Sequence, residues 1–97
     1  MLARPLLSGG SVPTISQFFG IVIQMYFKDH APPHFHAAYG GAWATVRIDP
    51  VGLLKGELPP RALGLVTEWA RLHRAELLED WERARRLQAL DPIPPLE

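Results

Sequence analysis

Residues 34–48 read HFHAAYGGAWATVRI, in which two segments of alternating character flank a pair of glycines. Glycine readily adopts the positive φ of the two-residue turns that connect antiparallel strands. The pair Gly40-Gly41 therefore predicts a β-hairpin, with strands over residues 34–39 and 42–48.

A two-residue loop also fixes the register of the hairpin, with His36 opposite Thr45 and His34 opposite Arg47. Successive side chains of a strand point to opposite faces of a sheet, so this register sorts the residues into two sets. The apolar set, which we expect beneath a helix, comprises Phe35, Ala37, Tyr39, Ala42, Ala44, Val46 and Ile48. The other set, which we expect on the face away from the helix, comprises His34, His36, Trp43, Thr45 and Arg47.

The sequence on either side of the hairpin predicts further strands. Residues 19–27 have apolar side chains at every odd position, which is typical of a strand with one buried face. The segment from Lys28 to Pro33 is a connector, because consecutive prolines are excluded from a central strand. After a turn at residues 49–52, residues 53–58 predict a short fourth strand, although Gly56 disfavours it.

The C-terminal half predicts a helix that begins at Pro59-Pro60. At about 100° per residue, its apolar side chains form one stripe. The stripe comprises Ala62, Leu63, Val66, Trp69, Ala70, His73, Leu77, Trp81 and Ala84. The stripe drifts in its second half, so we expect a kink or break near residues 73–76. His73 lies in the middle of the stripe and is interpreted as a core residue.

Together these elements predict an α+β fold. A three- to four-stranded antiparallel β-meander would pack on a long or kinked C-terminal helix. The expected organisation is a flexible tail over residues 1–12, a single domain over residues 13–90, and an extended tail over residues 91–97.

Composition excludes several classes of protein. The chain has 97 residues, a formal net charge of zero and no cysteine. Disulfides and cysteine-ligated zinc are therefore excluded, and we expect a reducing, cytoplasmic location. The balanced charge argues against general affinity for duplex DNA. No apolar run approaches the roughly 20 residues of a membrane-spanning helix.

The segment Asp29-His30-Ala31-Pro32-Pro33-His34-Phe35-His36 holds most of the chemically reactive side chains, and three interpretations compete. In the first, His34 and His36 bind a divalent metal ion, with His30 or Asp29 as a third ligand. Alternate residues of a strand can reach the same ion. Arg47 beside His34 opposes this interpretation, because a nearby cation repels a divalent ion.

In the second interpretation, the same face binds an anion or RNA. Phosphate contacts would come from Arg47, Lys28 and the histidines, and a base would stack on Trp43 or Tyr26. Either strand histidine would serve as a general acid or base, and the Arg47 cation would depress the pKa values of both. In the third interpretation, His30 or His34 only hydrogen-bonds the proline turn, and the outer face packs on a partner.

Four stretches of the chain form a recognisable pattern. They are PTISQFFGI at residues 13–21, DHAPPHFH at residues 29–36, GELPPRAL at residues 56–63, and the run from Glu68-Trp69 through His73-Arg74 to Trp81. With them, the chain from residue 13 to about residue 86 resembles a bacterial family of domains of unknown function, DUF4160.

The resemblance implies a component of a toxin–antitoxin-like two-gene module, with a small protein encoded by a neighbouring gene as its partner. It implies no established activity and no catalytic residue, while RNA and a second copy of the chain are further expected partners. Such proteins look as if they begin Met-Pro-Thr-Ile, so Val12 before Pro13 predicts an alternative start codon at Val12.

Overall fold

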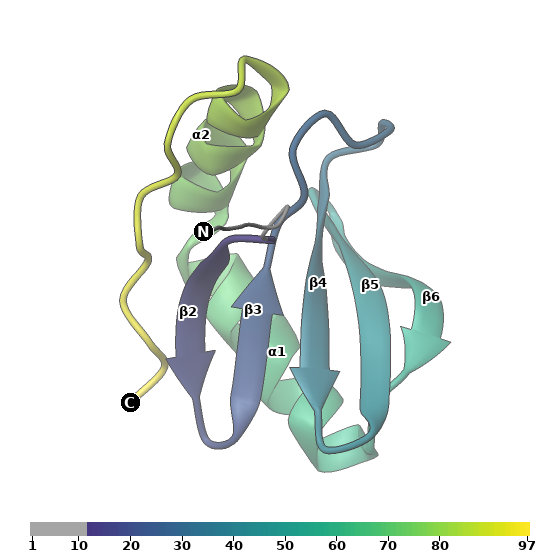
Figure 1. Cartoon of the computed structure of the whole chain (residues 1–97). Coiled ribbons are helices and arrows are strands. Elements are labelled where there is room, and N and C mark those ends of the chain that lie inside the picture. Colours follow the sequence, from purple (N-terminus) through teal and green to yellow (C-terminus); the bar gives the residue numbers. More distant parts are fainter. Residues whose placement is uncertain (1–11) are drawn as a thin grey trace, which may run out of the picture.

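The computed structural model describes residues 12–97, which form a five-stranded antiparallel sheet and two helices (Figure 1). The strands are β2 (Thr14–Phe18), β3 (Ile21–Gln24), β4 (His34–Tyr39), β5 (Ala42–Ile48) and β6 (Val51–Glu57), and they lie side by side in that order. Helix α1 (Pro60–Leu72) covers one face of the sheet, and α2 (Arg74–Arg85) extends beyond one end of it. The α+β fold is therefore confirmed. The predictions for residues 1–11 fall outside the described residues.

Strands β4 and β5 are the predicted hairpin, with the predicted bounds and register. His34 pairs with Arg47, and His36 pairs with Thr45. Gly40 has a φ of 59°, a conformation that side chains disfavour. The glycine pair alone therefore predicted the position and register of the two strands of this hairpin.

The prediction of one strand over residues 19–27 is wrong, because the chain turns back at Phe19-Gly20. These residues have φ values of 49° and 80°, and β2 pairs with β3 across the turn. Phe19 is consequently 59% exposed. The alternating pattern predicted one strand because Ile21 and Ile23 do share the buried face. Phe19 also occupies an odd position, but it lies in the turn and not in the strand.

The sheet has more strands than the three or four predicted, because β2 is a strand of its own and β6 is present. Strand β6 begins at Val51 rather than at residue 53 and forms one edge of the sheet. Gly56 lies inside it with a φ of 77°. A Cβ atom at this position would come within 2.4 Å of the Trp43 carbonyl oxygen, so only glycine fits beside this part of β5.

The predicted C-terminal helix is divided in two, because the backbone leaves helical geometry at His73. The break falls within the expected interval of residues 73–76. His73 is half-buried beside the break, at the edge of the core and not within it. Its ring centroid lies 5.6 Å from that of Trp69, and its Nδ1 lies 2.6 Å from Glu76 Oε1. The other central residues of the stripe are buried as predicted, namely Val66, Trp69, Ala70, Leu77 and Trp81.

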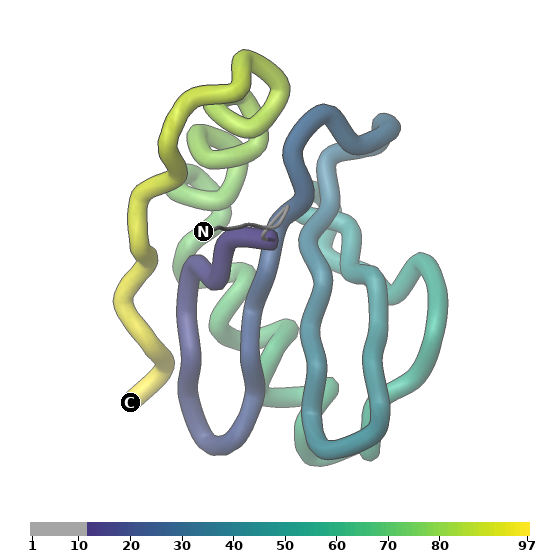
Figure 2. The backbone as a smooth tube through the Cα atoms, viewed as in Figure 1, coloured from purple at the N-terminus to yellow at the C-terminus, as the bar shows by residue number. Residues whose placement is uncertain are grey.

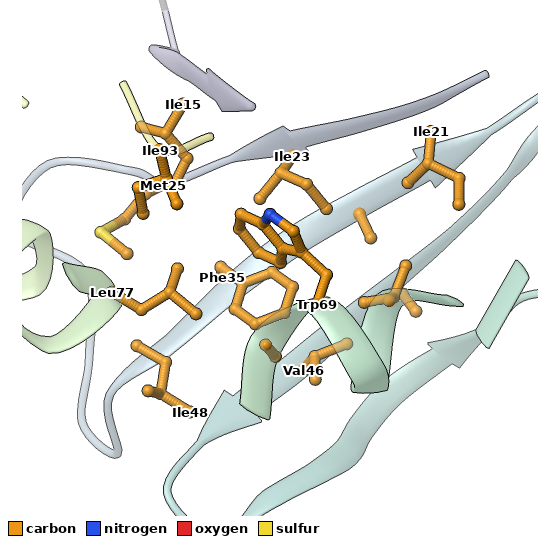
Figure 3. Packing of buried hydrophobic residues seen from close by; sticks show 14 of the residues in the cluster. Ile15, Ile21, Ile23, Met25, Phe35, Val46, Ile48, Trp69, Leu77 and Ile93 are labelled. Carbon is orange, nitrogen blue, oxygen red and sulfur yellow. The ribbon is translucent and has the colours of Figure 1, made fainter. Parts of the chain in front are cut away.

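Trp69 of α1 occupies the centre of the hydrophobic core (Figure 3). Its ring centroid lies 5.4 Å from that of Phe18 and 5.7 Å from that of Phe35. Ile23 of β3 and Val46 of β5, the two strands on either side of β4, are fully buried around it. The apolar face of the sheet and the apolar face of α1 therefore form one continuous core.

The C-terminal segment is extended, and it runs back beside β2 (Figure 2). The backbone N–H of Ile93 donates to the carbonyl oxygen of Ile15 at 2.7 Å, and Trp69 Nε1 donates to the carbonyl oxygen of Pro94 at 2.9 Å. Ile93 itself is only 4% exposed. The segment thus adds to the core and covers the outer edge of β2, a contribution that the sequence analysis did not anticipate.

No helix among residues 12–97 combines the length and the apolar character that crossing a bilayer requires.

Candidate functional site

The connector between β3 and β4 carries Asp29 to the first residues of β4. The backbone N–H of Lys28 donates to the carbonyl oxygen of Ala84 at 3.3 Å, which ties the connector to the end of α2. The backbone N–H of His30 donates to Asp29 Oδ1 at 2.8 Å. One carboxylate oxygen is thus held by the connector itself, and the other is directed at the strand.

Asp29 Oδ2 lies between two histidine rings of β4. It is 2.9 Å from His34 Nε2 and 3.4 Å from His36 Nε2. One ligand atom from each of these three residues lies within 4.8 Å of the other two. The arrangement follows from the strand, because side chains two residues apart project from the same face.

Each histidine also has an oxygen partner on its other ring nitrogen. His34 Nδ1 lies 2.7 Å from the carbonyl oxygen of Pro32, and His36 Nδ1 lies 3.3 Å from Thr45 Oγ1. A carbonyl oxygen only accepts, so His34 must donate from Nδ1, and a neutral ring then has a lone pair on Nε2. That lone pair faces the Asp29 carboxylate at 2.9 Å. Two electron-rich atoms at this distance require a second proton on the ring or a cation between them.

His34 is more enclosed than predicted. It is 8% exposed, and its ring centroid lies 5.1 Å from that of Trp81 in α2. The expectation that the histidines lie away from the helix holds for α1, whose Trp69 packs on Phe35 from the other face, but it is wrong for α2. The break at His73 explains the difference, because it allows α2 to reach the end of the sheet where β4 begins (Figure 1).

The cluster is more open on the side of His36. The Tyr26 ring lies 4.2 Å from the His36 ring, with an angle of 30° between their planes, and Tyr26 is 44% exposed. The side chains of His36 and Asp29 retain 22% and 20% exposure. A small ion therefore has access from this side, while Trp81 closes the site beside His34.

The pKa values of Asp29 and His36 are both shifted toward the protonation states that metal ligands need. Burial raises the pKa of Asp29, but hydrogen bonds from the His30 backbone and from the His34 and His36 rings outweigh this effect and lower it. Burial lowers the pKa of His36, and the charge of His34 adds to the shift against the opposing effect of Asp29. An ionised carboxylate and a neutral imidazole are both required for binding a cation. The His36 shift has the predicted direction, but burial and not Arg47 is its main cause.

Arg47 does not take part in the cluster. Its Nε donates to the carbonyl oxygen of Pro50 at 3.0 Å, and its guanidinium lies over Gly52 of β6, where a Cβ atom would be 3.4 Å from Nη2. The pairing of Arg47 with His34 is as predicted, but the long side chain extends toward the strand on the other side of β5. The Arg47 cation therefore does not oppose a metal ion at the cluster. It is also not placed to bind an anion there.

The side chains of the other predicted site residues, His30, Trp43 and Lys28, do not take part in the cluster. His30 is exposed and contributes only its backbone N–H. Trp43 is 51% exposed, and its ring packs on Gly56, where a Cβ atom would meet Cε3 at 2.9 Å. The Lys28 side chain is exposed, and the backbone there has a φ of 52°.

Sequence reasoning missed two contacts of the histidines, those with Thr45 and with Trp81. Thr45 was assigned to the correct face, and its position opposite His36 was the signal for its hydrogen bond. Trp81 had no such signal, because its position depends on the helix break. The hydrogen bond of His34 to the Pro32 carbonyl is the contact with the proline turn that the third interpretation expected.

The donor set suits a divalent transition metal. Two imidazole nitrogens and one carboxylate oxygen are typical ligands of zinc, iron and related ions. Ligand atoms at ~2.0–2.2 Å from a tetrahedral ion lie roughly 3.4 Å from one another. The separation of His36 Nε2 from Asp29 Oδ2 equals this value at 3.4 Å, and that of His34 Nε2 is shorter at 2.9 Å. Metal-binding histidines commonly donate their other N–H to an oxygen, the role that Pro32 and Thr45 fill here.

The cluster lies within a segment that matches a protein-family model. No curated protein and no solved structure shows a significant match to the chain. Residues 20–82 match the model described as "Domain of unknown function (DUF4160)". The matched segment includes Asp29, both strand histidines, their oxygen partners and Trp81. The chain therefore belongs to the DUF4160 family.

Proposed function

We propose that this domain binds a divalent transition-metal ion through Asp29, His34 and His36. The proposal is carried by one observation: both histidine Nε2 atoms converge on a single carboxylate oxygen, while each Nδ1 has an oxygen partner. A cation between Nε2 and the carboxylate satisfies the lone pair of a neutral His34 and leaves its Nδ1–H free to donate to Pro32.

The number of ligands indicates the type of site. Structural zinc sites have four protein ligands, whereas catalytic sites have three and keep a position open for water or substrate. Three residues converge within the described part of the chain, and the site is accessible beside Tyr26. We therefore infer a catalytic or sensing site, at which the ion would activate a water molecule or polarise a bound oxygen.

Direct measurement of metal binding tests the proposal. Chelator-treated protein should bind one zinc or cobalt(II) ion per chain in isothermal titration calorimetry. Asp29→Asn, His34→Ala and His36→Ala should each lower the affinity by at least about a hundredfold, because each removes a ligand. His30→Ala and His73→Ala are matched controls that remove a histidine outside the cluster. Parent-like binding by the first three variants would rule out this site.

A purely structural hydrogen-bond network is the competing interpretation, and thermal denaturation separates the two. If the cluster binds a metal, an ion at about one hundred times its Kd should stabilise the parent by about 2.7 kcal/mol and leave Asp29→Asn unchanged. If the cluster only anchors the connector, Asp29→Asn should melt earlier than the parent by the same margin with and without metal.

The finer predictions from the family resemblance stay predictions. They comprise the toxin–antitoxin-like module, the partner encoded by a neighbouring gene, RNA and a second copy of the chain as further partners, and the cytoplasmic location. Expression with and without the neighbouring gene tests the first two. Growth arrest that the neighbour relieves and that His36→Ala abolishes would link the module to the metal site. Unimpaired growth in every case would contradict a toxin role.

A further inference from the structure

A pocket of about 550 Å³ lies at the end of the sheet opposite the histidine cluster. Its walls include Phe19 from the β2–β3 turn, Tyr39 from the end of β4, and Leu65 from α1. His34 and Tyr39 are the first and last residues of β4, so the two sites are separated by roughly 16 Å along the strand. Pockets of roughly 300–1,000 Å³ are typical of small-molecule sites.

Two exposed aromatic side chains form the rim of the pocket. Phe19 is 59% exposed and Tyr39 is 40% exposed, although the sequence placed both on the buried face. The Tyr39 ring packs against Gly20, where a Cβ atom would lie 3.4 Å from its Cε1 atom. The Phe18 and Phe19 rings meet edge to face at 6.4 Å. Both rim side chains are therefore held by contacts with residues 18–20 around the β2–β3 turn. Their exposed apolar surface faces the pocket.

Arg61 is the charged residue that lines the pocket. It takes part in no ion pair among residues 12–97, and no acidic residue lines the pocket. The first turn of α1, to which Arg61 and Ala62 belong, also contains no acidic residue and no side-chain cap. Arg61 is exposed, and a neutral apolar ligand that covered its guanidinium would remove water without replacing the hydrogen bonds, which is unfavourable. An anionic group would replace them with stronger ones.

We propose that this pocket binds a small organic anion, namely a carboxylate attached to an aromatic or branched aliphatic body. The carboxylate pairs with Arg61, and the body packs between Phe19, Tyr39 and Leu65. The ligand is a small molecule and not a protein surface, because the volume is that of a single-ligand site. This site is independent of the metal proposal, since it shares no residue with it.

NMR titration of the full chain with three carboxylates tests the proposal. The probes are 4-phenylbutyrate, indole-3-acetate and the branched 4-methylpentanoate, and the corresponding primary amides are uncharged controls. At least one carboxylate should shift the backbone signals of Gly20, Arg61 and Ala62. Its amide should bind at least about tenfold more weakly, because the charge-assisted hydrogen bond is lost. Equal binding of acid and amide, or no shift with any of the three acids, would overturn the proposal.

Two variants test the two halves of the pocket. Arg61→Gln should weaken binding of the best carboxylate about tenfold, whereas Arg85→Gln, which removes an exposed arginine of α2, should leave it unchanged. Phe19→Asn removes a wall but introduces Asn-Gly, the preferred pair for a two-residue hairpin turn, so it should fold at least as stably as the parent. A stable Phe19→Asn variant with unchanged affinity would show that the aromatic rim is not part of the site.

Discussion

The two faces of β4 carry opposite chemistry on alternate residues. Phe35 and Ala37 are 0% and 1% exposed and pack beneath α1, whereas His34 and His36 meet Asp29 on the other face. Many apolar contacts share the stabilisation on the core face. On the histidine face, one carboxylate from a connector organises both rings. The fold and the candidate site therefore share β4, and the core residue Trp81 also contacts His34. A change at a core residue away from Trp81 should leave the histidine face intact.

Replacing Trp69 tests whether the core face and the histidine face are independent. It should have the largest effect on the free energy of unfolding. Trp69 is fully buried and packs on Phe35, so Trp69→Ala should lower the free energy of unfolding by about 3–5 kcal/mol. Urea denaturation of the metal-free protein, followed by circular dichroism, measures this loss. Trp69→Phe keeps most of the packing and should bind zinc with the parent's affinity. A folded Trp69→Phe protein that no longer binds zinc would show that the two faces are coupled.

Thr45→Val tests the independence of the two faces by a change on the histidine face. The change keeps the shape of the side chain but removes the oxygen beside His36 Nδ1. Metal affinity should fall roughly 10- to 100-fold, as is usual when an outer partner of a ligating histidine is lost. The free energy of unfolding should change by less than about 1.5 kcal/mol.

Thr67→Val is the matched control for this prediction, because Thr67 donates to the Gly64 carbonyl oxygen in α1, away from the cluster. Titration calorimetry of both variants makes the comparison. Equal zinc affinity in the two proteins would mean that Thr45 does not orient His36.

Asp80 should give the smallest effect, and only on the stability of the fold. Burial raises the pKa of this carboxyl group against the lowering effects of the Asp91 backbone N–H and of Arg83, while the Asp91 charge raises it further. The folded state therefore holds the proton more tightly than the unfolded state. The resulting stabilisation is complete below the ordinary pKa of an aspartate and is lost as the pH rises through the raised value.

Asp80→Asn should remove this decline. Denaturation curves of the parent and the variant, measured from about pH 3.5 to pH 7, give the difference. The stability of the parent relative to the variant should fall with rising pH. A relative stability that rises with pH would show that the Arg83 pair, and not burial, governs Asp80.

Local sequence signals predicted the hairpin better than the turn before it. Gly40-Gly41 fixed the register because both glycines act within the turn itself. Phe19-Gly20 was missed because a phenylalanine with positive φ is uncommon, and the odd-position pattern continued through it. Apolar periodicity also located the buried side of both helices, although only its drift near His73 indicated that there were two.

The candidate site depended on information that is less local. The common face of His34 and His36 follows from β4 alone. Asp29 reaches them only through the path of the connector, and Arg47 turns to Pro50 although its backbone lies where the register predicted. Connectors and long side chains take their conformations from tertiary contacts, which neither helical nor strand periodicity encodes.

The hydrogen bond from Ile93 to Ile15 determines how this sheet can grow. Because the C-terminal segment occupies the edge at β2, β6 is the edge strand left for pairing among residues 12–97. A sheet with two free edges can add copies without limit, which is a route to fibres. A sheet with one free edge can add a single strand, and when two copies join through β6, no free edge remains. Pairing of two copies through β6 would therefore leave no free strand edge among residues 12–97.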